Sequence, residues 1–429
     1  MASQTITGIP TSRTNFTSKY YVADFCDTTR QKASLASRKQ SSTRGKTNHG
    51  SVNDEQWQKP LSKGQIYTSS NRSTKRALFR NGNTNSLVLN SSTRNFSRVI
   101  VRQSLVEQTA VDMKKLVDFL YEDLPHLFDD KGIDRTAYDE RVKFRDPITK
   151  HDTVSGYLFN IAMLKRLFRP DFQLHWVKQT GPYELTTRWT MVMTFMLLPW
   201  KPELIFTGTS EMGVNPETNK FCSHVDYWDS IKNNDYFSVE GLLDVFKQLR
   251  IYKTPDLESP NYQILKRTAT YEVRKYDPFI VVETNGDQLS GSRGFNDVAG
   301  YIFGKNSKAE KIPMTTPVFT QSLDSDESQV SIQIVLPLQK DMSSLPAPNQ
   351  EDISLRKVEG GIAAVVKFSG KPTEDIVKEK EKELRVSLTR DGLKPKLGCL
   401  FARYNDPGRT WNFIMRNEVL IWLEDFTIE

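Results

Sequence analysis

The first hydrophobic pattern after residue 100 covers about 105–252 and changes its period midway. Apolar residues recur at steps of three and four over 105–122 and 154–168, which predicts two helices around a short mixed segment at Tyr138–Phe144. Apolar and polar residues then alternate over 172–176 and 183–197, and two more strands are expected at 203–213 and 219–229. A closing helix over 238–251 carries its apolar residues on one side: Val239, Leu242, Leu243, Phe246 and Leu249. Helices followed by long strands predict an α+β unit with helices on one face of a sheet.

The second pattern covers 262–429 and repeats one order of elements. Strands at 271–276 and 279–283 precede a helix that starts near Ser292, and an alternating strand follows at 330–336. A similar order then recurs, with a strand at 362–368, a helix at 373–390 and strands at 397–404 and 418–425. Gly304 and Gly392 stand where the two helices should stop. Two β-α-β-β halves predict pseudo-twofold symmetry, as a curved antiparallel sheet or distorted barrel with two helices outside.

The remaining segments connect or precede these two units. Residues 253–261 are polar, contain Pro255 and Pro260, and read as a linker. Residues 1–100 hold 29 Ser and Thr, 16 Lys and Arg, and 4 Asp and Glu, with too few apolar residues for a core. This composition is typical of an organellar transit peptide, and we expect a plastid, with cleavage between Arg72 and Gln103. An uncleaved disordered tail is the alternative.

Charge and cysteine content narrow the function class. The basic excess lies in the leader, because residues 101–429 contain 43 Lys and Arg against 48 Asp and Glu, so we expect no nucleic-acid partner. The three cysteines, Cys26, Cys222 and Cys399, are too few for a disulfide framework, which favours a reducing compartment. The longest apolar tract, Met191 to Trp200, contains Thr194, so no membrane span is predicted. No metal-ligand spacing or catalytic triad is apparent, and we assign no metal or catalytic residues.

The 105–252 unit resembles the cone-shaped nuclear-transport-factor-like fold. Its segment before the second helix and its returning strand ending at Trp228 also resemble a domain of unknown function found in plants and cyanobacteria. Such cones have a pocket that can hold catalysis, for which Asp146, His175, His224 and Asp226 are the candidate acids and bases. The alternative is structural: a turn at Asp146, which precedes a proline, and strand-to-strand hydrogen bonds for His224 and Asp226.

Residues 262–429 resemble the SOUL haem-binding family. Six motifs stand in order at the family's spacing: Tyr271-Glu272-Val273-Arg274-Lys275-Tyr276, Tyr301-Ile302-Phe303-Gly304-Lys305-Asn306, Lys311-Ile312-Pro313-Met314-Thr315-Thr316-Pro317-Val318, Phe368-Ser369-Gly370, Tyr404-Asn405-Asp406-Pro407 and Arg416-Asn417-Glu418-Val419. Each motif is weak alone, and six in register are specific. The whole chain resembles plant plastid proteins that join this domain to the cone-like unit.

The resemblance implies reversible, non-covalent binding of haem or another porphyrin in an apolar cleft beside the first helix, with basic side chains toward the propionates. Mapped onto this sequence, the implied cofactor-binding residues are Arg293, Phe295, Val298, Ile302, Phe303, Lys305, Lys311, Arg409 and Met415. Lys308 is a further nearby cation. Family members often carry more basic residues on this helix, where this chain has Ala299 and Gly300. Phe295, Val298 and Ile302 could instead be ordinary core residues, because any helix that packs on a sheet buries such side chains.

The lack of a histidine ligand for iron distinguishes this domain from proteins that bind haem tightly. All five histidines lie before residue 262, at 49, 126, 151, 175 and 224, and Cys-x-x-Cys-His is absent. Binding would therefore depend on the porphyrin face, where burying roughly 400 Å² of apolar surface yields about 10 kcal/mol before association costs. That affinity suits a plastid carrier or buffer in the stroma or at a membrane, which could exchange porphyrin with haem-metabolising enzymes and form a homodimer.

Two rival functions stay open. In the first, the cone pocket belongs to a dehydratase- or isomerase-like enzyme, so that the 105–252 unit is catalytic although the chain as a whole is expected not to be an enzyme. In the second, the SOUL-like unit has lost porphyrin binding and acts as an interaction module.

Overall fold

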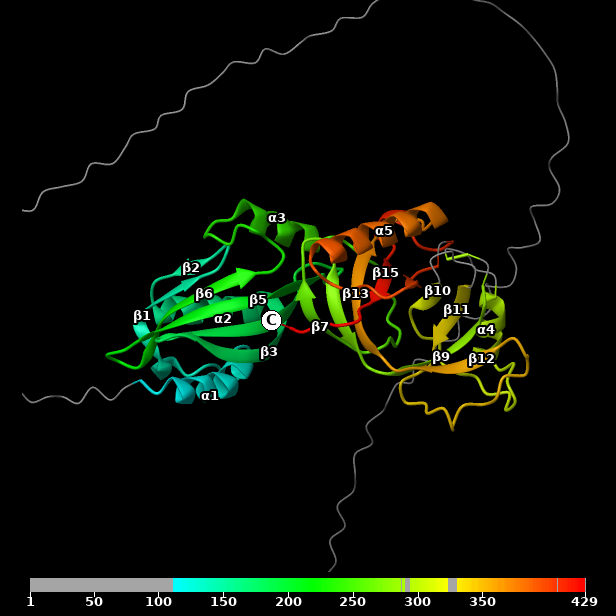
Figure 1. Cartoon of the computed structure of the whole chain (residues 1–429), viewed down its shortest axis with the longest axis horizontal. Coiled ribbons are helices and arrows are strands. Elements are labelled where there is room, and N and C mark those ends of the chain that lie inside the picture. Colours follow the sequence, from blue (N-terminus) through cyan, green and yellow to red (C-terminus); the bar gives the residue numbers. More distant parts are fainter. Residues whose placement is uncertain (1–110, 287, 290–293, 323–329, 407, 429) are drawn as a thin grey trace, which may run out of the picture. The chain divides into compact units, whose positions relative to one another are not determined.

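The structure, a computed structural model, describes residues 111–286, 288–289, 294–322, 330–406 and 408–428. The predicted leader and the first turns of the helix expected from residue 105 lie outside these residues. The α+β class is confirmed, with two sheets in chain order (Figure 1).

The first sheet has six strands in the order β2-β1-β6-β5-β4-β3 and carries the first core. Its elements are α1 (Met113–Asp123), the 3-10 turns η1 (Leu124–His126) and η2 (Arg135–Ala137), β1 (Tyr138–Arg145), β2 (Lys150–His151), α2 (Val154–Leu167), β3 (Phe168–Gly181), β4 (Glu184–Phe195), β5 (Glu203–Asn215), β6 (Lys220–Trp228) and α3 (Val239–Gln248). Helices α1 and α2 pack on this sheet, as predicted. The mixed segment at 138–144 is itself a strand, and it pairs in parallel with β6.

Helix α3 differs from the prediction in the direction of its apolar side. Val239, Leu243 and Phe246 are 65%, 53% and 66% exposed, whereas Gly241 and Asp244 are buried. Polar contacts set this orientation: Asp244 accepts hydrogen bonds from Ser230 and Arg267, and Gln248 accepts one from the backbone N–H of Ile205. Because these bonds need the polar side to face the protein, Val239, Leu243 and Phe246 face outward, and of the predicted stripe Leu249 packs on the core.

The second sheet has nine strands in the order β12-β9-β11-β10-β14-β15-β13-β8-β7 and forms a curled antiparallel half-barrel. Its elements are β7 (Tyr262–Arg267), β8 (Glu272–Tyr276), β9 (Phe279–Asn285), α4 (Phe295–Ile302), β10 (Val318–Ser322), β11 (Val330–Val335), β12 (Ser354–Val358), β13 (Gly361–Phe368), α5 (Glu374–Arg390), β14 (Cys399–Arg403), η3 (Asn412–Ile414) and β15 (Asn417–Trp422).

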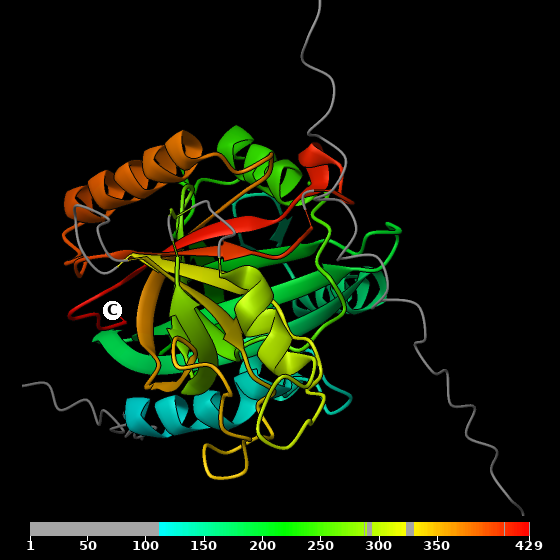
Figure 2. The ribbon, with the colours of Figure 1, turned by 90° about the vertical axis from the view of Figure 1, so that its right-hand side faces the viewer.

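This sheet is built from two equivalent halves, as the sequence predicted. The first half, β9-α4-β10-β11, lies in the sheet as β9-β11-β10, and the second, β13-α5-β14-β15, lies as β13-β15-β14. The halves meet where β10 pairs antiparallel with β14. Helix α4 contacts β9 and β11, and α5 contacts β13 and β15, which are the equivalent strands. Figures 1 and 2 show the two helices at separate places over the sheet.

Glycines end both helices of the second unit. Gly304 and Gly392 follow the C-caps of α4 and α5 with φ of +104° and +75°, in the left-handed region that glycine adopts without strain. At its other end, α5 is capped by Thr373, whose side chain accepts from the Ile376 N–H. Both predicted stops are confirmed.

Candidate functional site

Helix α4, the centre of the predicted porphyrin cleft, buries most of its apolar side chains. Val298 and Ile302 are fully buried in one core cluster with Val282, Ile332 and Ile334 of β9 and β11. Phe295 packs against the edge of this cluster. Of the two roles that the sequence left open for Val298 and Ile302, the structure therefore shows core packing. A cleft lined by these two side chains stays a prediction.

The exposed end of α4 keeps one aromatic residue and three cations. Phe303, the C-cap, is 45% exposed, and Lys305, Lys308 and Lys311 are exposed in the loop that follows. The position that departs from the family, Gly300, has a local explanation: a Cβ there would lie 3.1 Å from Cδ of Lys305. The Lys305 stem thus occupies the space that a side chain at 300 would take, and its charge stays beside the helix.

Two other predicted contact residues lie in the loop after β14 and beside the linker. Arg409 lies in the loop after β14, where its guanidinium is 3.8 Å from the Asp406 carboxylate. Met415 is buried next to the linker, where the Lys253 N–H donates to the carbonyl oxygen of Ile414. Arg293 lies outside the described residues.

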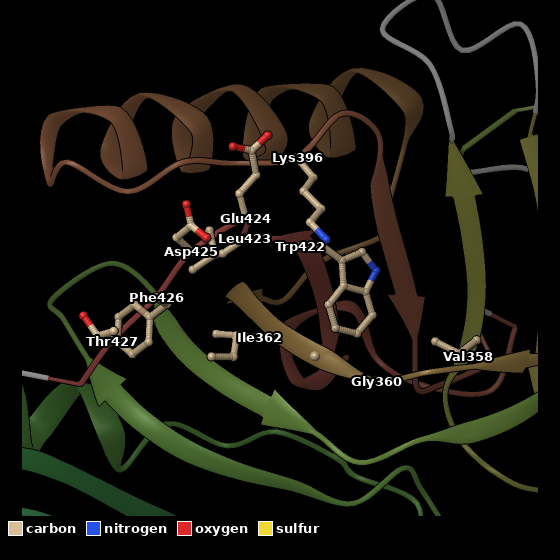
Figure 3. A pocket seen from close by; sticks show the side chains of 11 residues that line it. Val358, Gly360, Ile362, Lys396, Trp422, Leu423, Glu424, Asp425, Phe426 and Thr427 are labelled. Carbon is tan, nitrogen blue, oxygen red and sulfur yellow. The ribbon is translucent and has the colours of Figure 1, made fainter.

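A hollow lies elsewhere in the second unit, near the C-terminal segment (Figure 3). It has a volume of about 540 Å³, within the range of ligand pockets. Trp422, Phe426, Ile362 and Val358 supply its apolar wall, and its charged members are Lys396, Glu424 and Asp425. No residue of this hollow belongs to the set predicted from the sequence, because the hollow depends on how the C-terminal segment returns over β13.

Two of the six family motifs meet in a buried ion cluster, defined here as Glu272, Arg274, Arg416 and Glu418, and a third motif contributes Tyr404. Arg274 and Glu418 are fully buried and form two hydrogen bonds of 2.9 and 3.1 Å. Arg416 also bonds Glu418, at 2.8 Å, and the hydroxyl of Tyr404 donates to it at 2.9 Å. These motif residues hold strands β8, β13, β14 and β15 together. They are inaccessible to a ligand.

Electrostatics keeps this cluster ionised. Burial opposes the charge on Glu272, but Arg274 and Lys367 outweigh it and lower its pKa to about 2. Burial likewise opposes the charge on Glu418, and Arg274 and Arg416 outweigh it, so its pKa falls well below the usual range.

The described side chains fit a porphyrin's face and carboxylates better than its iron. Around α4, Phe303 offers apolar surface and three lysines offer positive charge. Of the four sulfur side chains in the second unit, which could ligate iron, Met342 is 42% exposed. Cys399 and Met415 are buried, and Met314 packs on the α4 core. Within the described residues there is no group of three His, Cys, Asp or Glu placed to hold a metal ion. No helix among them is long and apolar enough to cross a membrane.

The cone unit contains a second, smaller cavity of about 70 Å³. Asp146, His224 and Asp226 all line it, so three of the four acid–base candidates come together. His175 does not. Its Nε2 lies 2.8 Å from Oγ1 of Thr190, which donates to the Ile264 carbonyl oxygen on β7. The prediction of His175 as part of this site is wrong, because β3 directs it toward the second unit.

The candidates in the cavity are held by hydrogen bonds that the sequence did not reveal. Oδ1 of Asp226 is 2.9 Å from Nε2 of His224 and accepts from Oγ of Ser210 at 2.6 Å. Ser210 in turn accepts from Nε1 of Trp189 at 2.7 Å. The sequence predicted hydrogen bonds from 224 and 226 to a neighbouring strand, which Asp226 makes to Ser210, but it did not predict the contact between His224 and Asp226. Ser210 on β5 and Trp189 on β4 were missed because cross-strand register is not visible in one sequence.

Asp146 has the turn role that was the structural alternative, and it also faces the cavity. Its Oδ1 accepts from the N–H groups of Ile148 and Thr149, and its Oδ2 accepts from the Thr149 hydroxyl. Burial and the neighbouring Asp226 raise the pKa of Asp146 to about 6, against the effect of these hydrogen bonds.

The raised pKa of Asp146 predicts a pH dependence of stability. The folded state binds this proton more tightly than the unfolded state, so the stabilisation is full below pH 4 and is lost as pH rises through about 6. A shift of two units corresponds to about 3 kcal/mol, and we expect about 1–2 because Asp146 is half-buried. Asp146→Asn should remove this loss, so the free energy of unfolding, measured in urea at pH 4 and pH 7, should change less with pH in the variant than in wild type. Parallel profiles would contradict the assignment.

Comparison with known proteins assigns both units to families. Residues 257–422 match the family model described as SOUL heme-binding protein, and residues 114–224 match the model described as Uncharacterized conserved protein (DUF2358). Heme-binding protein 2 of Mus musculus is 30% identical over 122 residues, which are 27% of this chain and 56% of that protein. Heme-binding protein 2 of Homo sapiens is 28% identical over 181 residues, or 40% of this chain and 83% of that protein.

Solved structures similar to part of this chain include a hydrolase from Listeria innocua and an NTF2-like protein from Anabaena variabilis. The first is 12% identical, covers 36% of this chain and 92% of its own, and has a TM-score of 0.28. The second is 10% identical, covers 32% and 98%, and has a TM-score of 0.24. The family assignment rests on the family models: the chain carries a DUF2358 domain in residues 114–224 and a SOUL domain in residues 257–422.

Proposed function

We propose that this protein binds haem or a related tetrapyrrole reversibly through its SOUL domain and acts as a carrier or buffer. The observation that carries the proposal is the match of residues 257–422 to the SOUL family, whose relatives are named for heme binding. Binding is non-covalent and needs no histidine, because residues 262–429 contain none. Affinity without a strong iron ligand permits release, which a carrier requires.

Two places compete for the macrocycle, and their charges distinguish them. The hollow at Trp422 has a volume of about 540 Å³, but Glu424 and Asp425 oppose its one lysine, Lys396, and would repel the two propionates. The exposed end of α4 presents Phe303 with Lys305, Lys308 and Lys311, while the nearby Glu310 is paired with Lys340. Because a porphyrin dicarboxylate needs cations, we place it at α4, with Phe303 under the ring.

The composition of residues 1–100 supports a proposal for where in the cell the protein acts. The basic, hydroxyl-rich and acid-poor composition supports import into a plastid, where tetrapyrroles would be the ligands. Release there to haem-metabolising enzymes, and self-association through either domain, belong to the same proposal. Imaging of the first 100 residues fused to a fluorescent protein tests the location: a cytosolic signal would overturn it.

Hemin titration of the full chain tests the proposal. We expect a saturable change of the Soret band, and comparable binding of iron-free protoporphyrin IX because the iron has no strong ligand. Lys305→Glu with Lys311→Glu should raise Kd about tenfold, since each partly screened charge contributes up to about 1 kcal/mol. Phe303→Ser should also weaken binding without unfolding the protein, because Phe303 is already 45% exposed.

Matched variants locate the site. Lys382→Glu, an exposed lysine on α5 over the other half of the sheet, should leave Kd unchanged. Absence of a saturable Soret change would overturn the function. Normal binding by the α4 variants, with weakened binding by Lys396→Glu, would keep the function and move the porphyrin to the Trp422 hollow.

A further inference from the structure

Helix α3 (Figure 1) has an apolar side that faces solvent. Val239, Leu243 and Phe246 recur at steps of four and three residues, so these exposed side chains lie along one side of the helix. The polar bonds on its opposite side fix this orientation. Residues 225–256, which include α3, lie between the two family matches, so neither family model covers this feature. An exposed apolar surface that the fold maintains in this way indicates a docking site.

The backbone before the helix holds a further aromatic residue outward. Phe237 is 65% exposed and has a φ of +65°, in the left-handed region that is costly for a bulky side chain. The next residue, Ser238, is buried and fixes the chain there: its N–H donates to the Pro147 carbonyl oxygen at 2.8 Å, and its side chain accepts from the Gly241 N–H. Packing in the core does not offset the strain at Phe237, because the ring lies outside the core. This is what a residue used for docking would show.

Two turns extend the apolar surface at the C-terminal end of α3. Trp200, between β4 and β5, is 37% exposed, and its Nε1 donates to the carbonyl oxygen of Leu249 at 3.1 Å, so the polar group of the ring is satisfied. The N–H of Lys253 donates to the last carbonyl oxygen of η3 at 2.7 Å, which places η3 beside the segment that follows α3. Around η3, Trp411 and Phe413 are 72% and 59% exposed. Residues 237–246 together with Trp200, Trp411 and Phe413 are called the α3 face below.

Positive charge borders the α3 face at the same end. The stretch from Lys247 to Lys253 also contains Arg250 and has no Asp or Glu, and all three cations are exposed. The two carboxylates of α3 are engaged elsewhere: Asp244 is buried in its ion pair, and Glu240 accepts from two backbone N–H groups at the other end of the helix. An apolar stripe with aromatic residues and bordering cations is the arrangement that binds the surface of an anionic bilayer.

We propose that the α3 face docks this protein on the surface of a bilayer that contains anionic lipid. The apolar side chains enter the boundary between headgroups and acyl chains, and the three cations contact the lipid phosphates. Docking of this kind needs no spanning helix, because the bound helix lies in the plane of the surface. A second copy of the chain fits the face less well, since a twofold interface would place two net positive surfaces against each other.

Co-sedimentation of the full chain with lipid vesicles tests the proposal. Vesicles of phosphatidylcholine and phosphatidylglycerol in equal parts should bind the chain, and Phe246→Ser should lower the partition coefficient about fivefold, because it removes a ring that enters the bilayer. Phe159→Ser is the matched control: Phe159 on α2 is 67% exposed, against 66% for Phe246, but lies outside the α3 face, so binding should be unchanged. Melting curves show that both variants are folded, as expected for exposed positions.

Charge reversal tests the contact with anionic lipid. Lys247→Glu with Arg250→Glu should lower binding to the mixed vesicles about tenfold or more, because each cation near anionic lipid contributes about fivefold. The same pair should change little on vesicles of phosphatidylcholine alone. Lys382→Glu with Lys394→Glu alters the net charge equally at exposed positions of the second unit, and it should bind the mixed vesicles within about twofold of wild type.

The basic leader would attract the same vesicles, and a second copy would cover the same face, so the variants must separate these explanations. If Phe246→Ser and Phe159→Ser bind equally well, the α3 face does not enter the bilayer and the proposal is overturned. A dimer in lipid-free solution that Phe246→Ser converts to a monomer, as measured by analytical ultracentrifugation, would overturn it as well, because a second copy would then cover the face. Neither result bears on haem binding, which the hemin titration tests.

Discussion

Replacing Glu418 by Gln should destabilise the protein by about 3–5 kcal/mol. Glu418 is fully buried between Arg274 and Arg416, and its removal leaves two guanidinium groups with Glu272 as their remaining carboxylate. An intact buried ion pair adds little net stability, because its attraction is largely offset by the cost of taking both charges out of water. When one partner is removed, the desolvation cost of the other charge is no longer offset, so the folded state loses much more stability. Urea unfolding at pH 7, monitored by far-UV circular dichroism, measures the difference.

The same variant has a predicted pH signature. The pKa of Glu418 is lowered in the folded state, so its contribution is present above the unfolded pKa of about 4.5 and is lost as pH falls. The gap between wild type and Glu418→Gln should therefore narrow below pH 4.5. Glu359→Gln, which breaks an exposed pair with Lys357, should stay within about 0.5 kcal/mol of wild type at every pH.

A double-mutant cycle measures the interaction energy between Arg274 and Glu418 apart from the effects of each single substitution. Arg274→Met combined with Glu418→Gln removes one charge of each sign, so the loss should be smaller than the sum of the single losses. Additive losses, or a single loss under 1 kcal/mol, would show that Arg274 and Glu418 do not form a buried pair in solution.

This cluster explains why the family could be recognised from the sequence, whereas its ligand site stays a prediction. The residues that carry the resemblance are largely structural: Arg274 and Glu418 tie strands, Gly304 ends α4, and Asn306 bonds the Tyr301 and Glu310 carbonyl oxygens to shape the next loop. A fold constrains such positions, so their spacing is informative. A ligand surface made of exposed lysines carries no comparable pattern.

Periodicity predicted the elements well and their orientation less well. Apolar spacing located α2, α4 and α5, and the repeated element order predicted the pseudo-twofold sheet. It failed at α3, where the buried ion pair of Asp244 and Arg267 outweighs the apolar stripe. Spacing also could not tell that Val298 faces the core rather than a cleft, because a buried face has the same period in both cases.

The cone cavity shows the same limit at a second site. Asp146 and Asp226 were visible as candidates because both are carboxylates near strand ends. Asn160 and Thr187 could not be identified as cavity residues, since a polar residue on a helix or strand usually faces solvent, and only the packing of α2 on the sheet buries both.

The two domains are joined by a second buried ion pair, and breaking it should have the other large effect. Arg267 of β7 forms bonds of 2.8 and 2.9 Å to Asp244 of α3, and the Arg267 N–H also donates to Oγ1 of Thr207 on β5. Both charged side chains are largely buried, and they belong to the same compact unit of the chain. Asp244 otherwise has only neutral donors, Ser230 and Gln248.

We expect Arg267→Ala to reduce the free energy of unfolding by about 3 kcal/mol and to lower Tm by about 6–12 °C, because Asp244 would keep a buried charge without its partner. The single calorimetric transition should split into two, because the domains would lose the ion pair that links them. Arg135→Ala is the matched control: it removes an arginine with two bonds to Glu140, but both side chains are exposed, so Tm should change little. Adding Asp244→Asn to Arg267→Ala should restore part of the stability by removing the unpaired carboxylate. If Arg267→Ala melts in one transition at the temperature of Arg135→Ala, the two domains are coupled by their apolar contacts instead, and the ion pair only sets the orientation of α3.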